Sequence, residues 1–120
     1  MPLNIYLLIE DKTTGETIGY SYYRNFKALQ GYFDRKFDLK NGDEVLLSFQ
    51  AISTIYDILK TVDYTSERAE ELLPTHAEPD FGSYEYDERY FSFISQATSD
   101  FHHAKYIDFN KYNLYFTSNW

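Results

Sequence analysis

Strand-like segments stand at both ends of this sequence, and between them apolar residues recur at helical spacing. Residues 4–9 form a short apolar run typical of a buried strand, and residues 17–23 are rich in β-favouring types after a turn at Gly15. Together they predict an antiparallel hairpin. Apolar and polar residues alternate over 112–116, which predicts a last strand. Because an isolated hairpin is only marginally stable, we expect this last strand to pair with it.

The first predicted helix follows the hairpin. Its apolar residues recur at three- and four-residue spacing and are Phe26, Leu29, Phe33 and Phe37. Asn25 directly precedes them, and asparagine is a favourable N-cap because its side chain can accept a hydrogen bond from an amide of the first turn. We therefore expect a helix that is capped by Asn25 and ends near residue 38.

The Asn41-Gly42 pair allows two interpretations of the segment that follows it in the sequence. Asn-Gly is a strong hairpin signal, whereas glycine is also the preferred residue just past the end of a helix. Apolar residues then repeat with helical period for more than three turns, so we predict a helix over 44–62. A strand over 44–49 is the alternative.

Two more helices, separated by a long loop, are predicted for the rest of the chain. Thr65 or Ser66 is expected to cap a short acidic helix that Pro74 terminates, whereas residues 74–86 show no periodicity. A last amphipathic helix is predicted over 87–106. The order of elements predicts a single α+β domain, with three to four helices packed on one face of a small antiparallel sheet. The predicted core consists of Ile5, Leu7, Ile18, Phe26, Leu29, Phe33, Phe49, Ile52, Leu59, Ile94, Phe101, Leu114 and Phe116.

Composition and motifs argue against catalysis. The chain has no cysteine, which excludes disulfides, zinc ribbons, iron–sulfur sites and thiol nucleophiles. It has no nucleophile elbow, no phosphate-cradling glycine loop and no His-Glu-x-x-His motif. Two sets of side chains could be considered as metal ligands, Asp100 with His103 on the last helix and His76 with Glu78 and Asp80 in the loop. We interpret both as solvated polar surface and predict no metal, no cofactor and no enzymatic activity.

The N-terminal apolar run is too short for a membrane span and has no basic flank, so we predict neither a signal peptide nor a membrane segment. Together with the lack of cysteine, this favours a cytoplasmic protein.

The negative charge is concentrated in one part of the sequence. The net charge is −8, and residues 63–88 carry nine acidic residues against the single cation Arg68. Contact with nucleic acid through this window is therefore not expected, since phosphate backbones require clustered lysine and arginine. Tyrosines stand between the acids, and tyrosine is enriched at protein interfaces.

This acidic window has two interpretations. It is either a solvated surface that keeps the protein in solution or a surface that binds a basic protein. Carboxylates along one face can imitate a row of phosphates, so a nuclease or a toxin with a basic groove is the expected partner. No membrane contact is expected, and the sequence does not predict the oligomeric state. The predicted partner-binding residues are Asp63, Glu67, Glu70, Glu71, Glu78, Asp80, Tyr84, Glu85, Tyr86, Asp87 and Glu88.

In length and charge, the chain resembles the small acidic inhibitors that phages and mobile elements direct at nucleases, and also the immunity proteins that neutralise toxins. The resemblance covers composition only and carries no residue correspondence. It implies an anti-defence protein of the anti-CRISPR kind, or an immunity protein, that inhibits a nucleic-acid-handling protein by DNA mimicry. A structural or adaptor domain is the second hypothesis, and a small enzyme without a recognisable motif is the third.

Overall fold

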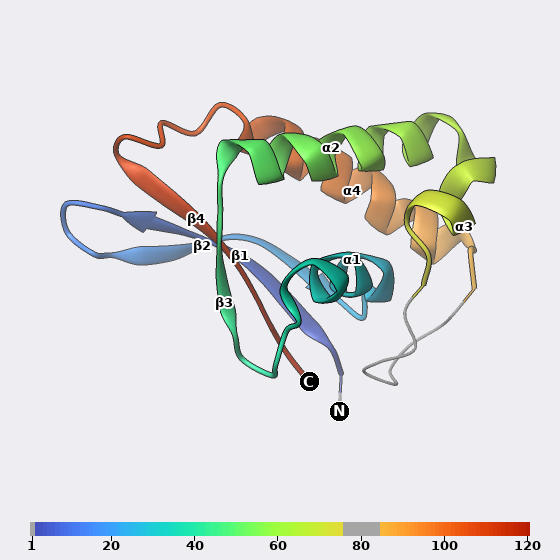
Figure 1. Cartoon of the computed structure of the whole chain (residues 1–120), viewed down its shortest axis with the longest axis horizontal. Helices are drawn as coiled ribbons and strands as arrows, with labels where there is room; N and C mark the ends of the chain where they lie inside the picture. Colours follow the sequence, from blue (N-terminus) through green and yellow to red (C-terminus); the bar gives the residue numbers. More distant parts are fainter. Residues whose placement is uncertain (1, 76–84) are drawn as a thin grey trace.

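A four-stranded antiparallel sheet forms one layer of the described part of the molecule (Figure 1). The structure is a computed structural model and describes residues 2–75 and 85–120. The strand order is β2-β1-β4-β3, so the last strand lies beside the first and completes the predicted hairpin. The strands are β1 (Asn4–Asp11), β2 (Thr17–Arg24), β3 (Glu44–Leu47) and β4 (Tyr112–Asn119).

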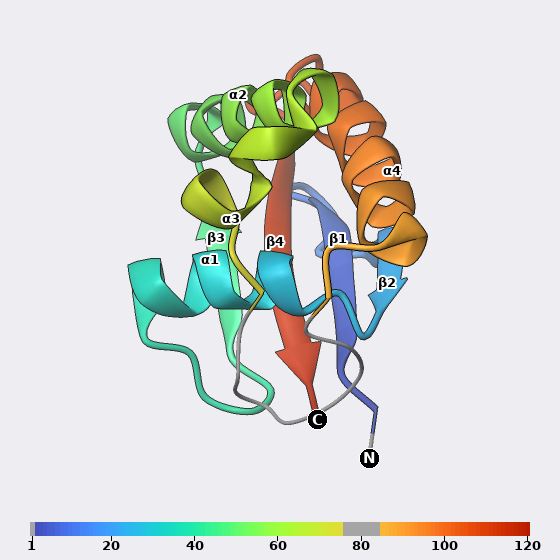
Figure 2. The same ribbon diagram turned by 90° about the vertical axis from the view of Figure 1, so that its right-hand side faces the viewer.

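The helices cover one face of this sheet, as Figure 2 shows. Helices α2 and α4 run side by side in opposite directions, and α1 crosses below them. The predicted α+β class, the one-sided helix layer and the pairing of the last strand with the hairpin are confirmed. The helical elements are α1 (Lys27–Phe37), α2 (Phe49–Tyr64), the 3₁₀ turn η1 (Ser66–Arg68), α3 (Ala69–Leu72) and α4 (Glu88–Ala104).

The sheet buries one face because successive side chains of a strand point to opposite sides. Ile5 and Leu7 of β1 and Leu114 and Phe116 of β4 are fully buried beneath the helices. Leu7 lies opposite Phe116 in the register, and the Phe116 ring lies 4.2 Å from that of Phe33 in α1, measured between centroids. Burial of each such side chain stabilises the fold by about 1.5–3 kcal/mol.

The predicted helix over 44–62 is wrong at its start. Val45 and Leu47 belong to strand β3, and each lies opposite a buried residue of β4. The helix begins only after Ser48, whose Oγ accepts a hydrogen bond from the amide of Ala51 at 3.1 Å. The apolar residues of a four-residue segment fit a strand and a helix equally well, so pairing with β4 decides between them.

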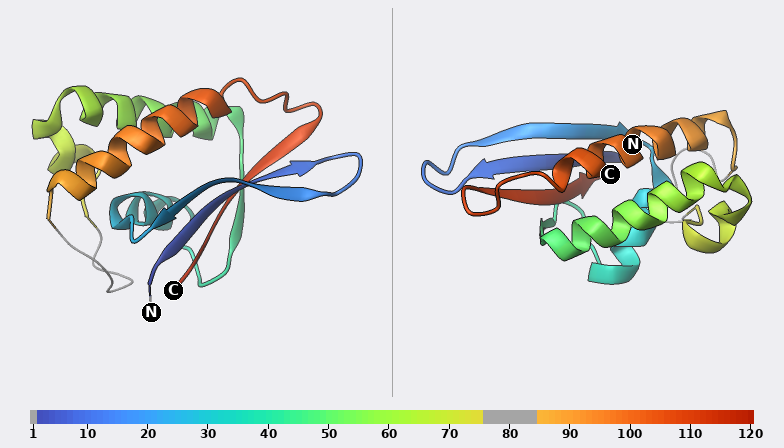
Figure 3. Two further views of the ribbon diagram at one scale, coloured as in Figure 1. Left: turned by 180° about the vertical axis from the view of Figure 1, so that it is seen from behind. Right: turned by 90° about the horizontal axis from the view of Figure 1, so that it is seen from above.

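Two predicted core residues are exposed, while the others are buried. Phe49 is 52% exposed because it stands at the first position of α2, outside the face that packs on the sheet. Ile18 is 58% exposed. It lies near the turn of the β1–β2 hairpin, which projects beyond the helix layer (Figures 1 and 3). The error at Ile18 arises because periodicity shows which face a residue shares but not how far the covering layer extends.

Asn25 does not cap α1. Its backbone adopts the left-handed conformation, with φ of 61°, and its Oδ1 accepts a hydrogen bond from the amide of Leu3 at 2.9 Å. The N-cap position is taken by Phe26, which makes no side-chain cap hydrogen bond. Asparagine tolerates this conformation better than most residues. Asn25 therefore forms the sharp corner between β2 and α1 and ties it to the start of β1.

Candidate functional site

The described part of the acidic window gathers at one end of the molecule. The end of α2, the turn η1, helix α3 and the start of α4 lie together there, farthest from the β1–β2 hairpin (Figures 1 and 3). Asp63 is the last residue but one of α2 and Glu67 lies in η1, whereas Glu88 begins α4. Every described carboxylate of the window is exposed, and we call this set the acidic end: Asp63, Glu67, Glu70, Glu71, Glu85, Asp87 and Glu88. The predicted residues Glu78, Asp80 and Tyr84 lie outside the described residues, as does His76.

Arg68 is paired within the acidic end. Its Nη2 donates to Glu71 Oε1 at 3.1 Å, and its Nε donates to Glu71 Oε2 at 3.4 Å. The hydrogen bonds and the charge of Arg68 lower the pKa of Glu71 and, in return, Glu71 raises the pKa of Arg68. Since both side chains are in solvent, the pair contributes little to stability. The pair matters for the surface charge instead. Arg68 neutralises the carboxylate of Glu71 and does not neutralise the other carboxylates of the acidic end.

Some predicted binding residues have structural roles. The Asp87 carboxylate caps α4, accepting a hydrogen bond from the amide of Tyr90 at 3.1 Å. Tyr86 is half-buried, with its ring 5.0 Å from that of Tyr90, and its hydroxyl accepts a hydrogen bond from the Thr75 amide at 3.2 Å. The Tyr90 hydroxyl donates to the carbonyl of Leu73 at 2.7 Å, and burial raises the pKa of Tyr90. These contacts join the start of α4 to the chain that leaves α3.

Among the described residues of the acidic end, Tyr64 is an exposed aromatic side chain. It is 83% exposed at the last position of α2, next to Asp63. The sequence places Tyr64 within the acidic window but gives no sign that its ring is more accessible than that of Tyr86. That difference follows from the packing of α4, so it could be found only in the tertiary structure.

Asp100 and His103 do not converge on a common site. The Asp100 carboxylate faces β2, where Oδ2 accepts hydrogen bonds from Ser21 Oγ and from the Tyr23 hydroxyl, each at 2.5 Å. His103 is exposed, and its ring lies 5.6 Å from that of His102. Across residues 2–75 and 85–120, no group of three or more His, Cys, Asp and Glu side chains could hold a metal ion. Asp100 therefore connects α4 to the sheet.

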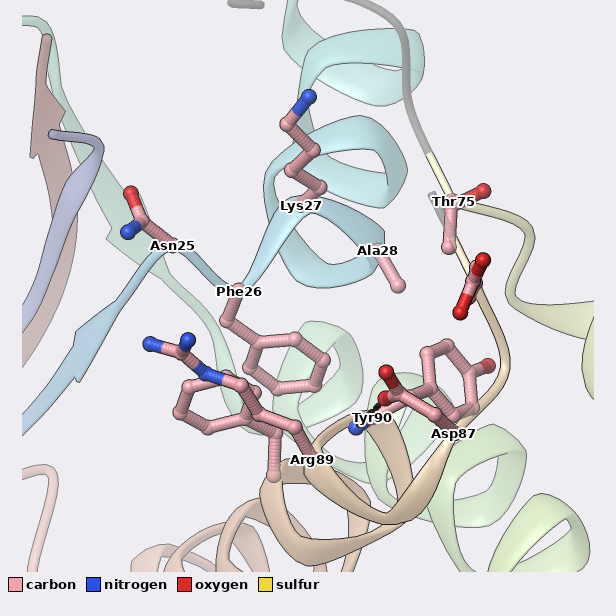
Figure 4. Close-up of a pocket in the computed structure, with 10 residues that line it drawn as sticks. Asn25, Phe26, Lys27, Ala28, Thr75, Asp87, Arg89 and Tyr90 are labelled. Carbon is pink, nitrogen blue, oxygen red and sulfur yellow. Dashed lines mark hydrogen bonds between the residues drawn. The ribbon is translucent and has the colours of Figure 1, made fainter. Parts of the chain in front are cut away.

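A small pocket lies between the start of α1 and the start of α4 (Figure 4). The Phe26 and Phe93 rings stack at 4.9 Å along one side, and the guanidinium of Arg89 lies 5.8 Å from the Phe93 ring. Lys27 is 2% exposed beside them. The cavity measures about 30 Å³, room for water-sized molecules and not for an organic substrate. The lining residues are Asn25, Phe26, Lys27, Ala28, Thr75, Glu85, Asp87, Arg89, Tyr90 and Phe93.

Cationic side chains gather around Tyr56, in the middle of α2. The ammonium of Lys105 lies 4.6 Å from the Tyr56 ring, and that of Lys60 lies 5.9 Å from it. The His102 ring lies 5.4 Å from the same ring. The sequence gives no signal of the whole cluster, because Tyr56 and Lys60 of α2 stand far along the chain from His102 and Lys105, and the two pairs meet only through the packing of α2 on α4.

Comparisons with known proteins give no relative from which a role could be transferred. No protein-family model matches the chain, and no significant match was found among curated proteins or solved structures. Among the helices of the described residues, none combines the length and the apolar character needed to cross a membrane.

Proposed function

We propose that this protein binds a basic protein through its acidic end and thereby inhibits it. The observation that carries the proposal is the convergence of exposed carboxylates from α2, η1, α3 and α4 on one end of the molecule. Solubility does not require this gathering, because the same number of acidic residues spread over the whole surface would keep the protein in solution equally well.

Part of the acidic end has a local structural explanation, and part does not. Asp87 and Glu88 stabilise the start of α4 as cap and first-turn residue, where negative charge is favourable. The carboxylates of Asp63, Glu67 and Glu70 make no hydrogen bond or ion pair with another described residue. They lie on three successive elements, α2, η1 and α3, and like charges gathered on one surface repel one another, which is unfavourable for the folded state. A function in binding explains why this arrangement is present.

The partner that fits this surface is a protein with a basic groove for nucleic acid. Exposed carboxylates along the groove would occupy the positions of phosphates, and the long-range attraction would speed association. We therefore infer an inhibitor of a nuclease or toxin, of the phage anti-defence or immunity-protein type. The absence of cysteine suits action in a reducing compartment such as the cytoplasm.

The proposal is tested by capture of the partner with matched charge-reversal variants. Glu67→Lys with Glu70→Lys reverses two carboxylates of the acidic end. Glu44→Lys with Asp57→Lys reverses two exposed carboxylates elsewhere and changes the net charge equally. Wild-type protein and both variants are immobilised and exposed to cell lysate, and bound proteins are identified by mass spectrometry.

We expect a basic nucleic-acid-handling protein that wild type and the control retain and the acidic-end variant loses. Its association rate with purified wild-type protein should be at least about tenfold faster than with the acidic-end variant, and should fall steeply with salt. Added wild-type protein should inhibit the partner's cleavage of nucleic acid. A partner bound equally by both variants, or with an affinity that salt does not change, would refute binding through the acidic end.

A further inference from the structure

The sheet carries an open hollow where the β1–β2 hairpin extends past the helices. The hollow measures about 150 Å³, enough for an organic group of about the size of benzene. Four of its five lining residues belong to the β1–β2 hairpin, whose turn lies at the opposite end of the molecule from the acidic end (Figures 1 and 3). The hollow is lined by Ile9, Asp11, Glu16, Ile18 and Tyr112.

The floor of the hollow is apolar because the core face of the sheet continues beyond its cover. Ile9 lies opposite Ile18 on β2 and opposite the buried Leu114 on β4, so all three share the helix-facing side. Tyr112 lies on the same side, two residues before Leu114. Ile18 and Tyr112 are exposed although they belong to this face. Contiguous apolar side chains left exposed on one face are a feature of binding sites.

The rim of the hollow is acidic. Asp11 Oδ1 accepts hydrogen bonds from the amides of Thr13 and Thr14, at 2.8 and 3.2 Å, which fixes the carboxylate at the hairpin turn. The Asp11 amide donates to the Glu16 carbonyl at 2.8 Å, so the two acidic residues face each other across the hairpin. The neighbouring Lys12 directs its ammonium to the carbonyl of Phe109, at 2.5 Å. The residues that line the hollow thus include two carboxylates and no cation.

We propose that this hollow binds an arginine side chain presented by a partner protein. The apolar floor of Ile9 and Ile18 matches the aliphatic stem of arginine, and the carboxylates of Asp11 and Glu16 match its charged head. A planar guanidinium suits the site better than an ammonium, since it can bond a carboxylate through two N–H groups and lie against the Tyr112 ring. This proposal goes beyond the proposed function, because the hollow is separate from the acidic end. An experiment can refute one of the two proposals and leave the other standing.

The test uses n-butylguanidinium as a probe for the arginine side chain. Backbone amide signals of the ¹⁵N-labelled protein are followed by NMR while the probe is added to millimolar concentration. Methylguanidinium, which has the charged head and lacks the butyl stem, is the comparison ligand. Glu16→Gln removes one carboxylate of the rim, and Glu70→Gln makes the same change at the acidic end. Ile18→Ser removes part of the floor and, being exposed, leaves the core intact.

We expect saturable shifts centred on Ile9, Ile18 and Tyr112, with n-butylguanidinium bound at least about tenfold more tightly than methylguanidinium. Glu16→Gln should weaken this binding by about three- to tenfold, whereas Glu70→Gln should leave it unchanged. Ile18→Ser should reduce the advantage of the butyl chain and leave methylguanidinium binding as it was. Shifts spread over all acidic residues, shifts that do not saturate, or equal effects of Glu16→Gln and Glu70→Gln would each overturn the proposal.

Discussion

Replacement of Tyr23 by phenylalanine tests how α4 is held against the sheet. The Tyr23 side chain is 1% exposed, and its ring packs against Phe26 and Phe93 with centroid distances of 5.5 and 6.5 Å. Its hydroxyl donates to Asp100 Oδ2 at 2.5 Å, beside the hydrogen bond that Ser21 makes to the same oxygen. Tyr23→Phe keeps the ring and removes only the hydroxyl.

The expected loss of stability follows from the charge and the exposure of Asp100. A hydrogen bond to a charged group contributes about 1.5–3 kcal/mol. In the variant, Asp100 keeps the hydrogen bond from Ser21 and is partly exposed, so water can replace the lost donor. The lower end of the range therefore applies, and we expect the free energy of unfolding to fall by about 1.5 kcal/mol.

The assay is urea unfolding followed by the fluorescence of Trp120, the single tryptophan, and by circular dichroism. With a denaturant dependence of about 1.5 kcal/mol per molar urea, the midpoint should fall by about 1 M. Tyr22→Phe is the matched control, since Tyr22 is exposed and its hydroxyl donates to Asn4 on the open face of the sheet. The control should change the free energy by less than about 0.5 kcal/mol. Equal effects of the two variants would refute a stabilising role for the contact between Tyr23 and Asp100.

The comparison of wild type with Tyr23→Phe also predicts how the difference in stability depends on pH. Burial, and then the hydrogen bond to Asp100, raise the pKa of Tyr23 far above its usual value near 10. The native state therefore holds the phenolic proton more tightly than the unfolded state does, and this stabilisation is complete below pH 10. As the pH rises above 10 towards the native pKa, the unfolded state loses the proton first, and the stabilisation is lost.

Phenylalanine has no such proton, so the advantage of wild type over Tyr23→Phe should be constant from pH 7 to 9. It should have shrunk by about 1.4 kcal/mol at pH 11. An advantage that stays constant through pH 11 would contradict the raised pKa.

Two further predictions use the same urea titration. Ser48→Ala removes the side-chain acceptor for the Ala51 amide at the start of α2. It should lower the free energy of unfolding by about 1 kcal/mol. An unchanged free energy of unfolding would show that this cap does not stabilise the protein. Phe101→Ala, at a fully buried position of α4, should cost about 3–5 kcal/mol, whereas Phe49→Ala should cost less than about 1 kcal/mol. Similar costs at the two positions would contradict the exposure of Phe49.

The candidate site was only partly predictable. The sequence showed that residues 63–88 concentrate negative charge, and the described carboxylates among them are exposed. It did not show that Tyr64 is more accessible than Tyr86, because that depends on contacts between Tyr86 and α4. The hollow lined by Ile9 and Ile18 was missed altogether, since residues 4–9 were predicted to be a buried strand and Ile18 was predicted to be in the core.

Local periodicity determined the parts of the fold that the sequence alone could predict. Helices α1 and α4 carry repeats of about 3.6 residues and strand β4 a repeat of 2, and each repeat fits only one type of backbone. Strand β1 was predicted from an apolar run too short for a helix. The tertiary structure decided the rest. A segment of four residues such as β3 has too few apolar positions to separate the two periods, and pairing with β4 makes it a strand. The exposure of Ile18 depends on where the helix layer ends relative to the hairpin, a distance between elements that no local pattern contains.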